Sequence, residues 1–472
     1  MRRVILMVLL AALAAGTAGA LVPRGRAAPA AAPVRLATPL LSVRRVPEAL
    51  VGLRAETRLQ AAVERVAGDP ALAPWVAQSC LVVQVGGRTL HARRPDQPLI
   101  PASTLKLLTA EAAVAVLGAE TRLATVIKAD AAPSGGVVAG DLQVVGGGDP
   151  IIESDARAAR SPRQPVVRTR IEDVAQALVE AGVRQVTGGV RADEGRYDSE
   201  RARPGWKPSY QASGQVGPLS ALLVDDGQDA TGRPTAQPPL HFAQVLTDQL
   251  RARGVQVAGG PSLGAATGAV TVATKESLPV RELAAQMVRE SDNTTAELLV
   301  KEIGRTAGGA GTTEAGLVAA KTALARKGLA VGPLAVRDGS GLDRGDRATC
   351  SLLVAALVGA GRSSQLSDSL PVAGVSGTLQ KRFVNTPVVG RLRAKTGGLD
   401  EVSSLAGWVD PARPGAAPPL AFAVVANGVP TGLDANRLSD RLGVALGTWP
   451  DAPPPDAVDP DPPRPETRTS PP

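Results

Sequence analysis

Two segments near opposite ends of the 472-residue chain carry the patterns of a single sheet, and this separation constrains the fold more than any other feature. Residues 48–124 contain one hairpin pattern, and residues 279–450 contain three strand patterns. Between them, residues 125–278 alternate short β-like pieces with glycine and proline clusters. We therefore expect one split α/β (α+β) domain, an antiparallel sheet flanked by helices, interrupted by an inserted mixed α/β domain.

The first segment has three local patterns. A helical stripe over residues 54–66 predicts an amphipathic helix. Leu81–Val85 and Arg88–Arg93 flank Gly86-Gly87, which is typical of a tight hairpin. A second helix is expected from Thr104 to Leu117.

The rest of the chain gives further helix and strand patterns. In the insertion we expect strands at Thr125–Ala129 and Asp141–Val145 and helices at Ile171–Ala181 and Phe242–Arg253. After it we expect helices at Val280–Glu290, Thr294–Ile303 and Leu433–Leu446, and strands at Leu392–Thr396, Val402–Val409 and Leu420–Ala426.

The two ends of the chain do not have the pattern of a packed core. Residues 1–20 have the order of a secretory signal peptide, with Arg2 and Arg3 before an apolar run and small residues after it. This predicts export to the cell envelope, with an uncleaved anchor as the alternative. Residues 21–47 are an Ala-, Pro- and Arg-rich linker, and the Pro-rich tail 451–472 is expected to be disordered.

The overall charge favours anionic surroundings but not nucleic acid. The formal net charge is +8 and the sequence pI is about 9.9, which suits a peripheral membrane surface or an acidic cell-wall polymer. The arginines are scattered, however, and aromatic residues make up only 2% of the chain. The chain therefore has few side chains that could stack on nucleic-acid bases, and we expect no nucleic-acid partner.

Cys80 and Cys350 are the two cysteines of the chain. In an exported protein an even count favours a disulfide, and both residues flank elements of the same expected domain. We expect a bridge, and the alternative is two separate buried thiols.

Three short motifs could carry chemistry. In Ser103-Thr104-Leu105-Lys106 one helical turn places the amine beside a hydroxyl at a helix start, where a lysine of lowered pKa can act as base. Ser291-Asp292-Asn293 lies between two helices, where it can equally serve as a helix cap. Lys395-Thr396-Gly397-Gly398 ends a strand along which a substrate backbone could lie, and the N–H groups of Gly398 and Ser103 could hold an oxyanion.

In this order the motifs form the three-part signature of penicillin-binding acyl-serine enzymes. The chain resembles the D-Ala-D-Ala carboxypeptidase/endopeptidases of the penicillin-binding protein 4 type, peptidase family S13, over about residues 48–448. Further similar segments are Pro101–Ala110, Gly140–Pro150, Asp338–Leu342 and Leu370–Gly374. The resemblance implies a penicillin-binding/β-lactamase-like transpeptidase domain.

The resemblance also implies roles. Ser103 is the expected nucleophile, Lys106 its base, and Ser291 the proton donor to the leaving group. The expected substrate-binding residues are Asn293, Lys395, Thr396, Gly397 and Gly398 and, from weaker positional similarity, Asp149 and Arg344. The partners implied are peptidoglycan stem peptides and, as inhibitors, β-lactam antibiotics, with no cofactor and no metal. Asp149 could instead be a turn residue before Pro150.

Two departures from the family pattern stand out. Gly398 occupies a position where the family usually has Thr or Ser, so a side-chain contact to substrate is lost while the backbone N–H remains. The insertion is also short for the family, so that one subdomain is expected to be reduced or absent.

Other classes of protein fit less well. His91 and His241 are the two histidines, and neither lies near a Gly-x-Ser-x-Gly segment or in a metal-ligand spacing. A β-lactamase on the same fold is one alternative, although no loop suggests a water activator for deacylation. A catalytically silent cell-wall binding module is the other, although all key side chains are present.

Overall fold

The computed structural model describes residues 46–161, 165–413, 415 and 417–451. The expected signal peptide, all but the last two residues of the linker, and the tail from residue 452 lie outside these residues. In the part described, no helix is both long and apolar enough to cross a membrane.

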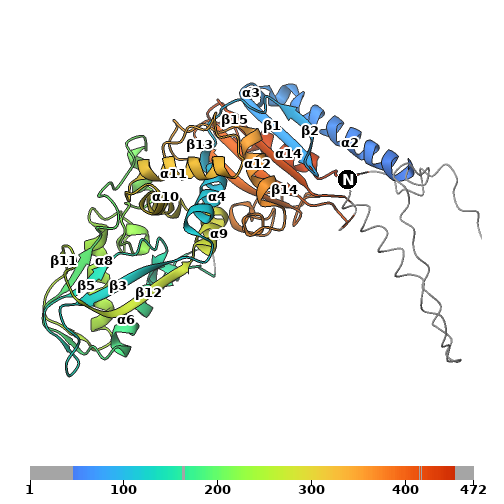
Figure 1. Ribbon diagram of the computed structural model, residues 1–472. Helices are drawn as coiled ribbons and strands as arrows, with labels where there is room; N and C mark the ends of the chain where they lie inside the picture. Colours follow the sequence, from blue (N-terminus) through green and yellow to red (C-terminus); the bar gives the residue numbers. More distant parts are fainter. Residues whose placement is uncertain (1–45, 162–164, 414, 416, 452–472) are drawn as a thin grey trace, which may run out of the picture.

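A five-stranded antiparallel sheet forms the centre of the larger domain and joins both ends of the chain. Its order is β13-β14-β15-β1-β2, so the early hairpin adds to the edge of three late strands. The strands span Ser79–Val85 (β1), Arg88–Arg93 (β2), Leu392–Leu399 (β13), Val402–Val409 (β14) and Leu420–Asn427 (β15). Figure 1 shows the two ends of the sequence, blue and red, side by side in this sheet.

Helices cover both faces of this sheet. Along β15 the alternation of a strand sends Ala421, Ala423 and Val425 into one apolar core and Phe422 and Val424 into another. The first core lies against α4 (Lys106–Leu117), α9 (Val280–Glu290), α10 (Asn293–Ala307), α11 (Thr313–Arg326), α12 (Cys350–Ala360) and α13 (Gln365–Asp368). The second lies against α2 (Val46–Ala67), α3 (Ala73–Val76) and α14 (Arg437–Leu446). Short 3-10 turns complete the domain at Pro70–Leu72 (η2), Ala102–Leu105 (η3) and Gly377–Leu379 (η5).

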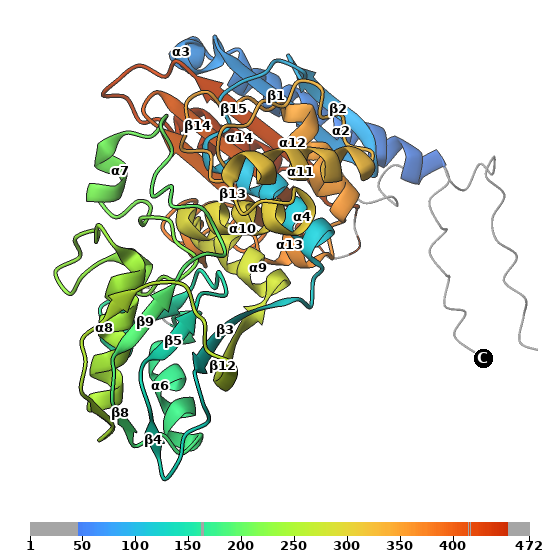
Figure 2. The same ribbon diagram turned by 60° about the vertical axis from the view of Figure 1, so that its left-hand side comes forward.

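The inserted domain has its own core. Two paired antiparallel strands, β3 and β12, connect it to the larger domain (Figures 1 and 2). These strands, Arg122–Ala129 and Val270–Pro279, extend the insertion slightly beyond residues 125–278. The other strands are β4 (Val137–Val138), β5 (Leu142–Val145), β6 (Ile152–Glu153), β7 (Thr169–Arg170), β8 (Gln185–Val186), β9 (Val190–Asp193), β10 (Gln256–Val257) and β11 (Ser262–Leu263). The helices are α5 (Asp155–Ala158), α6 (Ile171–Glu180), α7 (Pro208–Ala212) and α8 (Pro238–Arg251), with a 3-10 turn at Asp225–Gly227 (η4).

Some helix boundaries differ from the expectation. Helix α2 begins at Val46 rather than near residue 54, and its first buried residue from Leu50 onward is Ala55. Helix α14 begins at Arg437, four residues later than expected. Helices α11 and α12 have no counterpart among the expected elements. Helix α12 is a continuous apolar run, in which periodicity cannot tell a helix from a buried strand.

A disulfide joins Cys80 of β1 to Cys350 at the start of α12. Both residues are fully buried in the core on that face of the sheet. The bridge therefore ties the early hairpin to the second half of the domain across 270 residues of sequence.

Candidate active site

Ser103 lies in the 3-10 turn η3, directly before α4, and its side chain is partly exposed. The preceding residue, Ala102, has a φ of 47°, a strained conformation of the kind that clusters at functional sites. The Thr104 hydroxyl donates to the Pro101 carbonyl (2.7 Å), which fixes this turn. The candidate nucleophile therefore lies at the N-terminus of a helix, as the sequence predicts.

The amine of Lys106 is held by three oxygen atoms. Its Nζ lies 3.0 Å from the Ser103 Oγ, 2.6 Å from the Asn293 Oδ1 and 2.6 Å from the Ser340 carbonyl oxygen. Amide and carbonyl oxygens can only accept hydrogen bonds. In the neutral amine, both N–H groups are taken by these two oxygens. The lone pair is then left for the Ser103 hydroxyl, which is the geometry of a general base.

The orientation of the Asn293 amide depends on a second contact. Its Nδ2 donates to the backbone carbonyl of Gln215 (2.6 Å), which lies in the inserted domain. Because a carbonyl cannot donate, this contact fixes the nitrogen side of the amide and turns Oδ1 toward Lys106. The sequence gives no sign of this contribution by the inserted domain.

Burial sets the protonation of Lys106. The side chain is fully buried, and loss of solvation lowers its pKa to about 8, although the nearby Asp338 and Glu297 carboxylates oppose the shift. Burial together with the Asp338 charge in turn raises the pKa of the Glu297 carboxyl. An amine with a pKa near 8 can exchange a proton with a serine under mild conditions.

Ser291 pairs with the second lysine of the site. The fully buried Lys395 donates from Nζ to the Ser291 Oγ (2.8 Å) and to the carbonyl oxygen of Thr396 (2.8 Å). Ser291 itself has a left-handed backbone (φ 61°) at the end of α9. Asp292 caps α10 by accepting from the Thr295 N–H. The motif therefore combines helix capping with a hydroxyl placed beside a lysine.

The third motif lies on β13, the edge strand of the sheet. The Thr396 hydroxyl donates to the Thr378 Oγ1 (2.8 Å). A Cβ on Gly397 would lie 2.2 Å from the Ser404 Oγ, 2.9 Å from the Pro101 carbonyl and 3.0 Å from the Ser103 nitrogen, so only glycine fits. Gly398 is exposed and has open space around it.

The turn Asp338–Gly341 lies beneath the first motif. The sequence singles out this turn without assigning it a role. Its N–H groups at Gly339 and Ser340 donate to Glu297 of α10, and the Gly339 carbonyl accepts from Thr109 of α4. Gly341 has a φ of 83°, and a Cβ there would lie 2.0 Å from the Ala102 carbonyl oxygen. This packing presents the Ser340 carbonyl to Lys106.

Of the two weaker candidates, Asp149 bonds within its own turn of the inserted domain, whereas Arg344 lies beside the turn that follows the third motif. Asp149 is almost fully buried and accepts from the Ile151 N–H (3.1 Å), as a turn residue before Pro150 does. A cavity of about 280 Å³ beside Ser291 and Asn293 is lined by Pro150 but not by Asp149. Arg344 is partly exposed and donates to the Asp400 carbonyl in the β13–β14 turn (2.7 Å).

Comparison with known proteins identifies the family. The family model described as "D-Ala-D-Ala carboxypeptidase 3 (S13) family" matches residues 59–233 and 230–445. The chain belongs to this family. This S13 peptidase is 30% identical over 476 residues to a D-alanyl-D-alanine carboxypeptidase of Actinomadura sp. strain R39, a match that covers 83% of this chain and 85% of the relative.

Solved structures share the fold of this S13 peptidase. Penicillin-binding protein 4 of Haemophilus influenzae superposes with a TM-score of 0.66 at 20% identity, covering 78% of this chain and 95% of that one. The same protein complexed with a β-lactam gives a TM-score of 0.60, also at 20% identity, and covers 81% of this chain and 98% of that one. The expected penicillin-binding fold and the expected D-Ala-D-Ala serine peptidase are therefore confirmed.

Proposed function

We propose that this S13 peptidase cleaves D-alanyl-D-alanine-type bonds of peptidoglycan stem peptides through an acyl-enzyme on Ser103. One observation carries the proposal: the Lys106 amine has acceptors for both of its N–H groups and faces the Ser103 hydroxyl at 3.0 Å. A serine hydroxyl becomes a strong nucleophile only when a base takes its proton.

Acylation follows from this arrangement. The Ser103 Oγ attacks the carbonyl carbon while its proton passes to the Lys106 Nζ. The backbone N–H groups of Ser103 and Gly398 hold the resulting oxyanion. When the C–N bond breaks, Ser291 gives its proton to the leaving amine and regains one from the Lys395 ammonium, to which it is hydrogen-bonded.

Deacylation runs through the same groups in reverse. Water attacks the acyl carbon, and its proton passes through Ser291 to Lys395. The Lys106 ammonium returns its proton to the departing Ser103 oxygen. The enzyme is restored, and the net reaction consumes one water and releases the shortened peptide and an amine.

Substrate is proposed to lie along the outer edge of β13 over residues 396–399, beyond Leu392–Ala394, which pair with Pro371–Ala373. An extended peptide can add there as a further strand, because β14 pairs with the other side of β13. Asn293 retains a second N–H for a substrate carbonyl. The Thr396 hydroxyl would contact the terminal carboxylate, and Asp149 and Arg344 are proposed to contact the donor side chain.

β-Lactams are proposed inhibitors, since they mimic the scissile amide and stall the enzyme at the acyl stage. The β-lactam complex of the Haemophilus influenzae protein of the same fold supports this. The test is labelling of purified protein with fluorescent penicillin, followed by mass spectrometry of the labelled peptide. Label on the peptide containing Ser103, and none in Ser103→Ala, is expected. Label on another residue rejects the proposal.

The natural reaction is tested with purified muropeptides. Loss of the terminal D-alanine from monomers indicates a carboxypeptidase, and conversion of cross-linked dimers to monomers indicates an endopeptidase. No product from either class of substrate would contradict the proposed activity.

We infer that the protein works outside the cytoplasm, in the cell envelope. The signal-like pattern of residues 1–20 and the Cys80–Cys350 disulfide both support export. N-terminal sequencing of protein recovered from fractionated cells tests this, and an intact Met1 in the cytosolic fraction would contradict it. Association with the wall or a membrane surface is proposed from the net charge of +8.

A further inference from the structure

A segment of the inserted domain crosses onto the peptidase domain and reaches the catalytic motifs. This crossing segment, residues 196–217, has one short helix, α7, which lies beside the peptidase domain in Figure 2. It ends at Gly217, whose N–H donates to the Thr294 hydroxyl on α10 (2.8 Å). The contacts that it makes are specific and polar at both ends.

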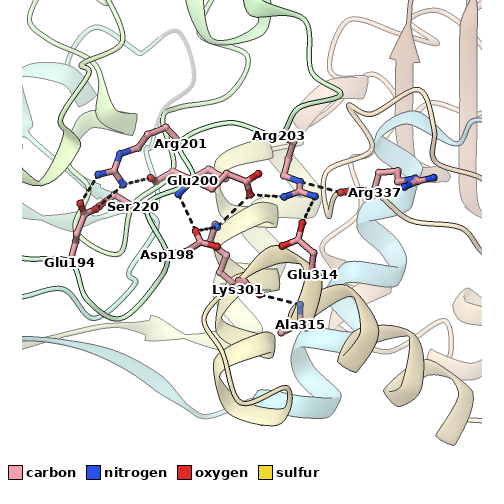
Figure 3. A network of polar contacts seen from close by, with 12 residues as sticks. Glu194, Asp198, Glu200, Arg201, Arg203, Ser220, Lys301, Glu314, Ala315 and Arg337 are labelled. Atoms are coloured by element: carbon pink, nitrogen blue, oxygen red, sulfur yellow. Dashed lines mark hydrogen bonds and ion pairs between the residues drawn. The ribbon is translucent and has the colours of Figure 1, made fainter.

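Ion pairs fasten the start of the crossing segment to α10. Lys301 is fully buried and bonds Asp198, while Glu302 accepts two hydrogen bonds from Arg196. Arg203 lies between Glu200 and Glu314 and donates to the Arg337 carbonyl (Figure 3). Lys301 and Glu302 are buried, and charge-assisted hydrogen bonds of this kind have a defined geometry. The crossing segment is thus fixed to the helix that carries Asn293.

Trp206, in the middle of this segment, connects it to the catalytic lysine. Its indole Nε1 donates to the Asp338 Oδ2 (2.8 Å). The Asp338 carboxylate also accepts from the N–H groups of Gly341 and Asp343, both at 2.7 Å. These bonds shape the turn whose Ser340 carbonyl, two residues on, receives the Lys106 amine at 2.6 Å.

The surroundings of Trp206 show that it is built into this position. The ring is buried in a small apolar cluster with Tyr197 and Tyr210 of the insertion and Leu298 and Leu342 of the peptidase domain. A Cβ on the preceding Gly205 would lie 1.9 Å from the Asp343 carboxylate. The chain therefore passes close to the Asp343 side chain, two residues after the Asp338–Gly341 turn.

We propose that the inserted domain positions Lys106 for catalysis, with Trp206 as a positioning residue that acts through Asp338 and the Ser340 carbonyl. This inference rests on the proposed function of Lys106. Without the indole N–H, the Asp338 carboxylate loses its hydrogen bond from the inserted domain and keeps those from Gly341 and Asp343. The Ser340 carbonyl then no longer fixes the Lys106 amine. The lone pair of the amine nitrogen therefore points at the Ser103 hydroxyl for a smaller fraction of the time.

The test is the acylation of Trp206→Phe by fluorescent penicillin, analysed for the first-order acylation rate constant and the dissociation constant of the preceding complex. We expect the rate constant to fall about tenfold and the dissociation constant to stay within about twofold, the loss expected for one hydrogen bond to a charged group. Trp449→Phe is the matched control, because it removes an indole donor to a backbone carbonyl far from the site.

The outcomes separate the alternatives. An unchanged acylation rate constant in Trp206→Phe, an equal fall in Trp449→Phe, or a change confined to the dissociation constant would overturn the proposal. The last result would mean that the ring contacts substrate directly. Wild-type protein that is not labelled at Ser103 would instead reject the proposed function and leave the positioning role without a reaction.

A second variant does not alter Trp206. Lys301→Met frees the start of the crossing segment, and the Asp198 carboxylate left behind is partly exposed and can be hydrated. We expect the same fall in acylation rate constant at an unchanged dissociation constant. Lys321→Met removes a lysine of α11 that donates to the Leu334 carbonyl; it is the control and should acylate normally. Normal acylation by Lys301→Met would contradict the role of the crossing segment.

Discussion

The Lys106 Nζ lies 3.0 Å from the Ser103 Oγ, three residues earlier on the same turn of chain. The amine is fully buried, and its other two contacts, Asn293 and Ser340, come from elements about 190 and 230 residues away. The two residues of this pair are therefore neighbours in sequence, but the orientation of the amine is set by the tertiary structure.

Replacing Lys106 with methionine should abolish acylation without unfolding the protein. The thioether fills the buried space but cannot accept the Ser103 proton, so the acylation rate constant should fall by about 10²–10⁴-fold. Fluorescent penicillin labelling and a thermal melt measure both quantities. Lys128→Met, on β3 of the inserted domain, is the control. Normal labelling of Lys106→Met would rule this lysine out as the base.

The acylation rate should depend on pH through the same amine. The base must be neutral, and burial lowers the pKa of Lys106 to about 8. Below this pH the neutral fraction falls about tenfold per unit, so the rate constant should rise from pH 6 and level off above about 8. Stopped-flow acylation across pH 6–9.5 measures the profile. A flat profile over this range would mean that another group takes the proton.

Replacing each of two adjacent glycines on β13 with alanine should affect the acylation rate very differently. In Gly397→Ala the new methyl group meets the Pro101 carbonyl and the Ser103 nitrogen, which forces the strand away from the nucleophile. We expect acylation to fall by at least about 100-fold, because small displacements of reacting groups are costly. In Gly398→Ala the new methyl group meets no atom closer than the Val402 carbonyl oxygen at 4.0 Å, so this variant should acylate at close to the wild-type rate. Equal rates in the two variants would contradict the described packing.

Asp346→Asn should stabilise the protein increasingly as the pH rises. Burial and the Asp338 charge raise the pKa of the Asp346 carboxyl from 3.8 to about 10. Between these values the folded state holds a proton that the unfolded state has lost, so this group reduces stability by about 1.4 kcal/mol for each rising pH unit. Asparagine keeps an acceptor for the Arg337 N–H and carries no charge. Thermal melts at pH 6 and 9 should show a larger gain at pH 9, and an equal gain at both would contradict the assignment.

Removing the disulfide should weaken the fold more than the activity. The bridge closes a loop of 270 residues and lies in the core rather than among the catalytic motifs. The variant Cys80→Ala/Cys350→Ala should lose about 2–4 kcal/mol of stability through the entropy of its unfolded chain and still be labelled by penicillin at 25 °C. Reductant should lower the melting temperature of the wild type and leave the variant unchanged. A reductant effect on both would point to another cause.

Much of the fold could be predicted because its signals are local. Gly86 and Gly87 both have positive φ, as the tight hairpin between β1 and β2 requires, and α9 has the predicted bounds Val280–Glu290. Helix α12 was missed because its side chains are apolar on all sides. The missing signal there is amphipathicity, because the exposed face of α12 also carries small or apolar residues, Ala355, Val358 and Gly359.

Local sequence patterns are enough to give the order of the three motifs, the one-turn spacing of Ser103 and Lys106, and a split domain with an insertion. The atoms that hold the amine are known only from how the chain packs: the Ser340 carbonyl, the Asn293 amide as oriented by Gln215, and the turn that Trp206 supports. Helical spacing is a property of neighbouring residues. A backbone carbonyl is present at every position, and only packing selects the one that faces the lysine.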